Sequence, residues 1–257
     1  GYHIPAKDLE ELDNIFKWPL HTAKQALIDS GYANRETVLS KCGLVLGNLS
    51  FPTKSSRRLM APIYRESVGA ALRDLLKNEH FELPSLPDMP NAPDPRNALI
   101  SGYPPTVVAQ ALALSGPTLA LDAACASSLY GIDLACRYLH NHKTDLMLAG
   151  AVSCADPLFI HMGFSIFHAY PENGQSNPLD QSSSGLIAAE GAGMCVLKRY
   201  DDAIRDNDHI YAVICGTGLS NDGKGKFVLN PNPQGQILAF ERAYDRAQID
   251  PSTIDYV

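Results

Sequence analysis

The sequence predicts an α/β fold built on a mainly parallel sheet, and two patterns support this. Short apolar runs are typical of buried strands, and helical periodicity marks the segments between them. The apolar runs lie at residues 42–47, 116–122 and 145–152. The helical segments lie at 20–30, about 54–77, 103–114 and 129–139. Strands that alternate with helices favour right-handed crossover units, in which a helix joins two parallel strands.

Turn residues indicate where several of these elements begin and end. Gly31 stops the first helix, and Pro104 with Pro105 suits the first turn of the third. The Pro-rich stretch at 83–94 is interpreted as an ordered connector. The C-terminal part continues the alternation. Further strands are predicted at 191–198, 210–216 and 254–257, and further helices at 201–207 and 235–248.

Composition is that of a globular protein. The 257 residues are 45% hydrophobic and 19% charged, enough for a sizeable core in one large or two small domains. A net charge of −7 without a long basic run argues against nucleic acid as the main partner. No apolar stretch approaches the ~18 residues of a membrane span, and no phosphate-binding glycine motif or metal-ligand pattern is present. We therefore predict no membrane span, cofactor or metal.

The cysteines indicate a reduced, cytoplasmic protein. Six are present at irregular spacing without a Cys-x-x-Cys pair, which fits neither a zinc site nor a disulfide framework. Because the chain begins at Gly1 rather than Met, we expect an upstream segment to be missing. Five cysteines lack a special setting and are interpreted as ordinary buried residues: Cys42, Cys136, Cys154, Cys195 and Cys215.

Cys125 has a different setting. It lies between the predicted strand 116–122 and the predicted helix 129–139, where the chain must turn sharply. Every residue within two positions of it is Ala or Ser, which lets a tight turn present one side chain at its tip. A thiol at a helix N-terminus also meets the positive end of the helix dipole, which favours the thiolate. Cys125 is therefore the candidate nucleophile.

The residues around Cys125 resemble the active-site signature of β-ketoacyl synthases. They read Asp-Ala-Ala-Cys-Ala-Ser-Ser-Leu at 122–129. Later segments resemble the family in the same order, with Asp-Leu-Met-Leu-Ala-Gly-Ala-Val at 145–152, Glu-Gly-Ala-Gly-Met-Cys-Val-Leu-Lys-Arg at 190–199 and Ser-Asn-Asp-Gly at 220–223. Residues 155–167 are most similar to the branch of polyunsaturated fatty acid synthases and heterocyst glycolipid synthases.

The resemblance implies a thiolase-like layered α-β-α-β-α fold, of which this chain supplies the first half and the start of the second. Residues 1–257 are expected to be the N-terminal part of one β-ketoacyl synthase domain, truncated at both ends. About 1–200 form the first α/β half, and about 201–257 begin the second. The family's later catalytic histidines have no counterpart among the eight histidines present, so the fragment itself is expected to be inactive.

The resemblance also implies an acyltransferase. In the family, a Cys-bound acyl chain condenses with malonyl on an acyl carrier protein, with loss of CO₂. The carrier's phosphopantetheine holds the substrates, and the domain itself needs no cofactor. A homodimer through the strand before Cys125 and neighbouring synthase domains are implied as partners. The basic cluster of Lys54, Arg57, Arg58 and Arg65 is either a solvated helix face or a docking patch for the acidic carrier.

Three further residues are candidates, each with an alternative left open. Phe164 and Phe167 belong to an aromatic stretch after a buried strand, where they either line the acyl channel or form core. Asp222 either begins an Asp-Gly turn or, as the resemblance implies, joins a polar network behind the active site.

Two other functions also stay open. A non-catalytic partner subunit of the chain-length-factor kind is disfavoured, because such subunits typically lack the cysteine. A Cys-dependent thioester hydrolase would need a His and an Asn or Asp beside Cys125. Spacing in the sequence does not exclude that arrangement.

Overall fold

The structure, a computed structural model, describes residues 2–86, 92–225 and 230–256. The chain divides into two units, Gly1–Lys198 and Arg199–Val257. The first unit contains the sheet and all the elements around Cys125. Within the described ranges, no helix combines the length and the apolar character that crossing a membrane requires.

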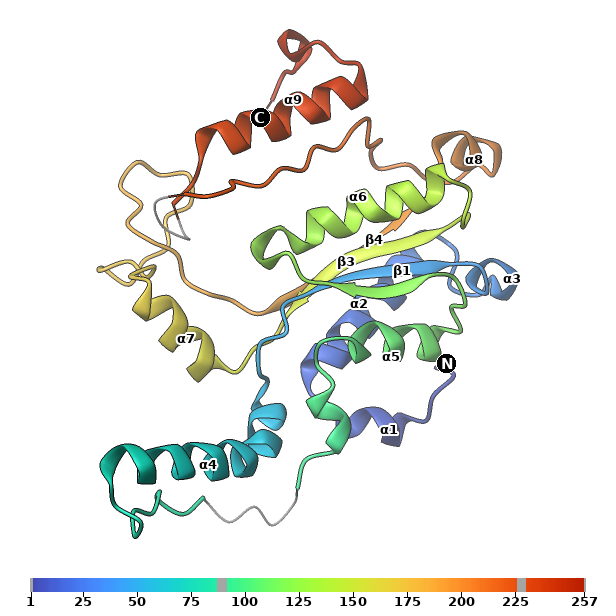
Figure 1. The fold of residues 1–257 in the computed structure, drawn as a ribbon. Coiled ribbons are helices and arrows are strands. Elements are labelled where there is room, and N and C mark those ends of the chain that lie inside the picture. Colours follow the sequence, from blue (N-terminus) through green and yellow to red (C-terminus); the bar gives the residue numbers. More distant parts are fainter. Residues whose placement is uncertain (1, 87–91, 226–229, 257) are drawn as a thin grey trace. The chain divides into compact units, whose positions relative to one another are not determined.

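A four-stranded sheet forms the centre of the first unit, with strand order β2-β1-β3-β4 (Figure 1). Its strands are β1 Gly43–Asn48, β2 Thr118–Leu121, β3 Met147–Ser153 and β4 Gly191–Leu197. β1 pairs in parallel with both β2 and β3, and β4 pairs antiparallel with β3. The mainly parallel sheet and all four of its strands were correctly predicted, and the pairing of β4 with β3 is antiparallel.

Helices of the first unit cover both faces of this sheet. α2 and α5 pack on one face and α6 on the other (Figure 1). The helices are α1 Ala6–Glu10, α2 Asn14–Asp29, α3 Glu36–Leu39, α4 Lys54–Leu76, α5 Tyr103–Leu112, α6 Ser127–His140 and α7 Pro157–Ile166. Two short 3₁₀ turns, Pro95–Ala98 and Ala124–Ala126, precede α5 and α6.

The two central strands, β1 and β3, are almost continuously apolar because both of their faces are buried over most of their length. Leu44 and Leu148 belong to the core cluster formed with α2 and α5. Val45 belongs instead to the cluster on the opposite face, which includes Ala135 of α6. Since successive side chains of a strand point to opposite faces, a strand between two helical layers has no position that favours a polar residue.

The helix predicted at 20–30 begins earlier than expected. α2 starts at Asn14 and has Pro19 inside it. Ile15 and Phe16 are fully buried and extend the apolar face of the helix towards its N-terminus. Their burial outweighs the hydrogen bond that proline cannot make.

The second unit contains the helices α8 Tyr200–Arg205 and α9 Pro233–Ala247, followed by a 3₁₀ turn at Pro251–Thr253. The predicted helices 201–207 and 235–248 are confirmed within about two residues. The strands predicted at 210–216 and 254–257 are wrong over the described residues, which place neither segment in a sheet. An apolar run becomes a strand only when a neighbouring backbone pairs with it.

Candidate active site

Cys125 lies at a sharp turn between β2 and α6. β2 ends at Leu121, the 3₁₀ turn covers Ala124–Ala126, and α6 begins at Ser127. Ala124, directly before the cysteine, has a φ of 50°. This left-handed conformation costs a residue with a Cβ roughly 1–2 kcal/mol, so its surroundings must stabilise the turn.

Hydrogen bonds from both sides of the turn provide that stabilisation. The buried Ser127 hydroxyl donates to the Ala124 carbonyl at 2.6 Å and accepts from the Ala123 N–H at 2.9 Å. The Asp122 carboxylate accepts from the Ala124 N–H at 3.0 Å and from the Ser50 N–H at 3.4 Å. The polar side chains that flank the cysteine therefore fix the backbone that presents it.

Gly47 explains how the start of α6 can lie so close to the sheet. A Cβ on this β1 residue would be 2.9 Å from the carbonyl carbon of Ser127, closer than packed atoms allow. Sequence reasoning did not single out Gly47. A glycine within an apolar strand often marks such a close approach of another backbone, and this was the available signal.

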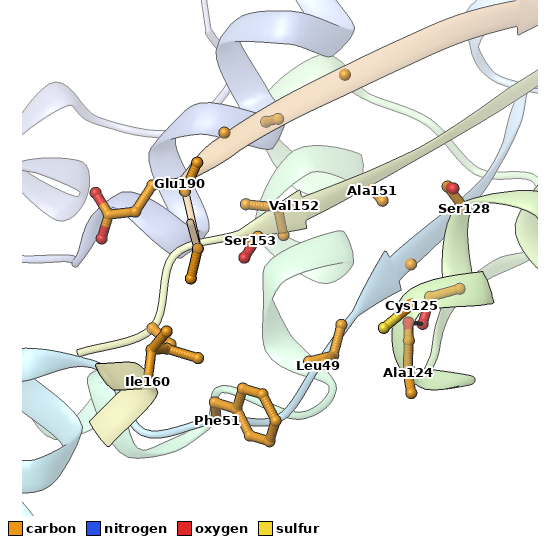
Figure 2. A pocket seen from close by; sticks show the side chains of 18 of the residues that line it. Leu49, Phe51, Ala124, Cys125, Ser128, Ala151, Val152, Ser153, Ile160 and Glu190 are labelled. Atoms are coloured by element: carbon orange, nitrogen blue, oxygen red, sulfur yellow. Dashed lines mark hydrogen bonds between the residues drawn. The ribbon is translucent and has the colours of Figure 1, made fainter. Parts of the chain in front are cut away.

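A cavity of about 620 Å³ opens in front of Cys125. Figure 2 shows the sulfur directed away from α6 into this space, with Ile160 on the opposite side. The side chain of Glu190 extends away from the cysteine (Figure 2). The larger apolar lining residues are Leu49, Phe51, Val152, Ile160 and Phe164, and Glu190 with the small residues at 188–189 and 191–193 completes the wall. The site therefore offers an exposed thiol beside a mostly apolar cavity.

The other cysteines are not equivalent to Cys125. Burial raises the pKa of the Cys42 thiol to about 12 and, with nearby carboxylates, that of Cys154 to about 11. Burial also raises the pKa of Cys136. Cys195 and Cys215 are exposed, so the expectation that they are buried is wrong. For Cys195 the reason is its place on β4, an outer strand of the sheet whose residues alternate between exposed and half-buried.

Of the two candidate phenylalanines, Phe164 lies at the same cavity as Cys125 and Phe167 does not. Phe164 lines the cavity from α7. Phe167 is the C-cap residue that follows α7, is 47% exposed, and is not among the lining residues. Asp222 lies in the second unit, where its carboxylate and carbonyl accept hydrogen bonds from Asn232 at 3.3 and 3.1 Å. Asp222 thus links the turn around Gly223, whose φ is 65°, to the start of α9.

Sequence reasoning also missed the connector between β1 and α4, and it missed His161 of α7. Leu49 and Phe51 of the connector line the cavity, as does His161 of α7. His161 Nδ1 lies 2.6 Å from the Tyr170 hydroxyl. The connector followed a strand predicted as buried, and its position at a strand's carboxyl end was the signal that pointed to a ligand site.

Family profiles match nearly the whole chain. Residues 2–203 match "Beta-ketoacyl synthase, N-terminal domain" and residues 211–257 match "Beta-ketoacyl synthase, C-terminal domain". The chain belongs to the β-ketoacyl synthase family. Cys125 of this ketosynthase chain lies at the turn between a strand and a helix where the sequence placed it, and its role as the nucleophile stays a prediction.

The curated relatives of this ketosynthase chain are much longer proteins. Over 97% of its length it is similar to two polyunsaturated fatty acid synthase subunits from Thraustochytrium sp., with 35% identity to one and 33% identity to the other. It spans only 12% of the first protein and 9% of the second.

Solved structures of ketosynthases share its fold. "PfaC Keto synthase-Chain length factor" superposes with a TM-score of 0.89 at 55% identity, over 100% of this chain and 27% of that one. The ketosynthase from module 6 of the bacillaene synthase of Bacillus subtilis 168 gives 0.74 at 28% identity, over 98% and 39%. The ketosynthase chain therefore has the thiolase-like α/β fold of these proteins, as the resemblance implied.

Proposed function

We propose that this chain carries the acyl-accepting part of a β-ketoacyl synthase that extends fatty acyl or polyketide chains. The observation that supports this is the thiol of Cys125, exposed at the start of α6 beside a largely apolar cavity. Membership of the family and the similarity to polyunsaturated fatty acid synthase subunits make an acyl chain the natural occupant of that cavity.

In the proposed reaction, the Cys125 thiolate attacks the carbonyl carbon of an acyl thioester. The carrier's thiolate leaves with the electron pair of the broken C–S bond, and a new thioester forms on Cys125. Malonyl on a carrier then loses CO₂, and the resulting enolate attacks this thioester. The products are a β-ketoacyl chain on the carrier and the regenerated Cys125 thiolate.

The residues of this chain favour the first of these steps. Cys125 lies just before the N-terminus of α6, where the positive end of the helix dipole favours the negative charge that develops during the attack. The N–H groups of Ala124, Ala126 and Ser127 already donate within the turn, so the N–H of Cys125 itself is the group that we propose for the developing oxyanion. Leu49, Ile160 and Phe164 supply apolar contacts for the acyl chain.

Two of the sequence predictions remain proposals here. Phe167 is outside the lining of the cavity, and its contact with the acyl chain requires the end of α7 to be rearranged when substrate is bound. Asp222 is proposed to belong to a polar network of the complete active site. Its hydrogen bonds to Asn232 are compatible with that role and also with a local turn.

The proposed partners follow from the same chemistry. They are an acyl carrier protein with its phosphopantetheine, neighbouring synthase domains, and a second copy of the ketosynthase in a cytoplasmic homodimer. The length of the curated relatives supports this, since a protein of which this chain covers only 12% has room for several further domains.

The test uses the intact synthase and an acyl thioester on its carrier. We expect mass spectrometry to detect the acyl group on Cys125. The acyl-enzyme should persist without malonyl carrier and lose its acyl group when malonyl carrier is added. Rapid release of free fatty acid without malonyl carrier would instead identify a thioester hydrolase. Absence of acylation at Cys125 would refute both.

A further inference from the structure

One wall of the Cys125 cavity is a single helix, α7. Pro157, Ile160, His161 and Phe164 of this helix all line the cavity. The outer side of the helix is open, since Leu158, Met162 and Ile166 are each more than half exposed. Its other contacts include ring contacts with Phe51 and Tyr170, so the hydrogen bonds at its N-terminal end contribute much of what fixes its position.

Those contacts meet at one buried carboxylate, Asp156. Its Oδ1 accepts from the Leu158 N–H at 2.9 Å and so caps α7. Its Oδ2 accepts from Arg57 Nε at 3.0 Å, and its own N–H donates to the Pro52 carbonyl at 2.7 Å. The Asp156 side chain is only 4% exposed, whereas that of Arg57 is 49% exposed. The ion pair thus joins a buried acid to a cation at the surface.

The other end of the ion pair is fixed to the core. Arg57 lies in the first turn of α4, which begins with a capping box between Thr53 and Ser56. Ser55 of the same turn donates to the Asp13 carboxylate at 2.6 Å through its hydroxyl and at 3.1 Å through its N–H. Asp13 is the N-cap residue of α2, a helix of the core. Arg57 therefore connects α7, through Asp156, to the start of α4, which is itself held to the core helix α2.

We propose that Arg57 and Asp156 are a positioning pair that sets which acyl chains fit beside Cys125. This inference rests on the proposed function and names the residues that determine its acyl selectivity. Loss of Arg57 would leave the Asp156 carboxylate buried with its charge uncompensated, and the first turn of α7 would move to hydrate it. Ile160 and Phe164 would move with that turn, which changes the depth of the cavity opposite the thiol.

Arg57 also belongs to the basic cluster that the sequence placed on α4, where docking of an acidic carrier is the competing role. The two roles differ in what they affect. Loss of a docking residue lowers the acylation rate of every carrier-bound substrate by the same factor and leaves the rate with small thioesters unchanged. A positioning residue changes the ratio of acylation rates between long and short acyl chains, whether pantetheine or the carrier protein presents them.

The experiment measures acylation of Cys125 in the intact synthase with thioesters of short, medium and long acyl chains, each presented once on pantetheine and once on the carrier protein. Arg57→Gln is compared with Lys54→Gln, which removes an exposed cation one turn earlier on α4. We expect Arg57→Gln to change the long-to-short ratio of rates by about tenfold, since displaced positioning groups have effects of up to about 100-fold. Arg57→Lys should restore much of the wild-type ratio, and Lys54→Gln should keep it.

Each other outcome has a definite meaning. Equal ratios in wild type and Arg57→Gln would overturn the proposal, as would a loss seen only with carrier-bound substrates and shared by Lys54→Gln. If Arg57→Gln does not yield folded protein, Asp156→Asn replaces it, because asparagine keeps the cap on Leu158 but not the charge facing Arg57. A wild-type Cys125 that no thioester acylates would refute the proposed function, and the present inference with it.

Discussion

At the scale of single residues, the site depends on Ser127 as much as on Cys125. The thiol is presented by a backbone turn whose left-handed Ala124 is stabilised by the Ser127 hydroxyl. Small side chains around Cys125 were therefore a sound signal in the sequence. They indicate the space that the turn requires, and not a direct role in the chemistry.

Replacement of Ser127 by leucine is expected to disrupt the turn itself. Ser127 is 2% exposed, and a larger apolar side chain would both overpack the site and remove two hydrogen bonds. Overpacking alone costs about 1–3 kcal/mol. We expect the intact synthase to show a lower thermal midpoint for this domain and a strongly reduced rate of Cys125 acylation. A fully active Ser127→Leu variant would contradict our account of the turn.

The matched substitution, Cys125→Ala, should separate chemistry from folding. Alanine fits the same turn and leaves every hydrogen bond of Ser127 in place, so unfolding should occur at the wild-type temperature. Acyl transfer should be lost completely, because no other thiol lines the cavity among the described residues. Retained acyl transfer would show that another group accepts the chain.

Cys42 gives a prediction about pH. Burial raises its pKa from 9.0 to about 12, so at pH 8 its thiolate is about a thousandfold rarer than in the unfolded chain. Alkylation of Cys42 by iodoacetamide should therefore be at least that much slower in the native synthase than in urea. The same shift lowers the stability of the fold as pH rises from about 9 towards 12, because the unfolded state releases this proton first. Quantitative mass spectrometry of the labelled peptide checks the rates, and equal rates would contradict the burial.

At the scale of elements, the close approach of β1 and α6 sets the place of the thiol. We expect Gly47→Ala to displace the first turn of α6, since its Cβ would lie 2.9 Å from the Ser127 carbonyl carbon. The expected cost is about 1–3 kcal/mol in unfolding free energy, with at least a tenfold slower acylation of Cys125.

Gly131→Ala is the control for this substitution. It lies in the same interface between β1 and α6, but its Cβ would be at an ordinary 3.5 Å from Val45 Cγ1. Alanine also favours the helix by about 1 kcal/mol. Gly131→Ala should therefore keep both stability and acylation, and similar losses in the two variants would contradict a specific role for Gly47.

The elements that the sequence predicted well are those determined by local patterns. The apolar runs that became β1 and β3 are buried between helices, the run that became β2 is half-buried, and the helices have recognisable ends. The runs at 210–216 and 254–257 have a similar composition, yet no strand pairs with them over the described residues. Pairing depends on which backbone lies alongside, and a single sequence does not contain that information.

The same reasoning applies within the site. Cys125 and its turn could be predicted because all their determinants lie within a few residues. The contact of Gly47 with Ser127 and the pairing of Arg57 with Asp156 join residues that are far apart in the chain. Nothing in either segment alone indicates its partner.

At the scale of the whole molecule, β2 is the strand that suits a contact with a second copy. It lies at the edge of the described sheet, with β1 as its neighbour on one side. An edge strand presents unpaired backbone groups, and two copies related by a two-fold axis can pair them. The homodimer proposed above would form in this way.

Single cysteines introduced along Thr118–Leu121 of the intact synthase test that arrangement. A two-fold axis places one residue of the strand beside its own copy, so at least one variant should form a covalent dimer on mild oxidation. Glu66→Cys, on the exposed surface of α4, is the control and should not. If none of the β2 variants forms a covalent dimer, the proposed interface is wrong.

The connector between β1 and α4 has one more consequence. Its Ser50 N–H donates to the Asp122 carboxylate at the reactive turn, and its Pro52 carbonyl accepts from the N–H of Asp156, the N-cap residue of α7. An acyl chain long enough to push α7 outward would therefore pull on the same few residues that support the sulfur. We therefore expect the two ends of the cavity to be coupled, so that in the proposed reaction a chain at its final length would slow its own next extension.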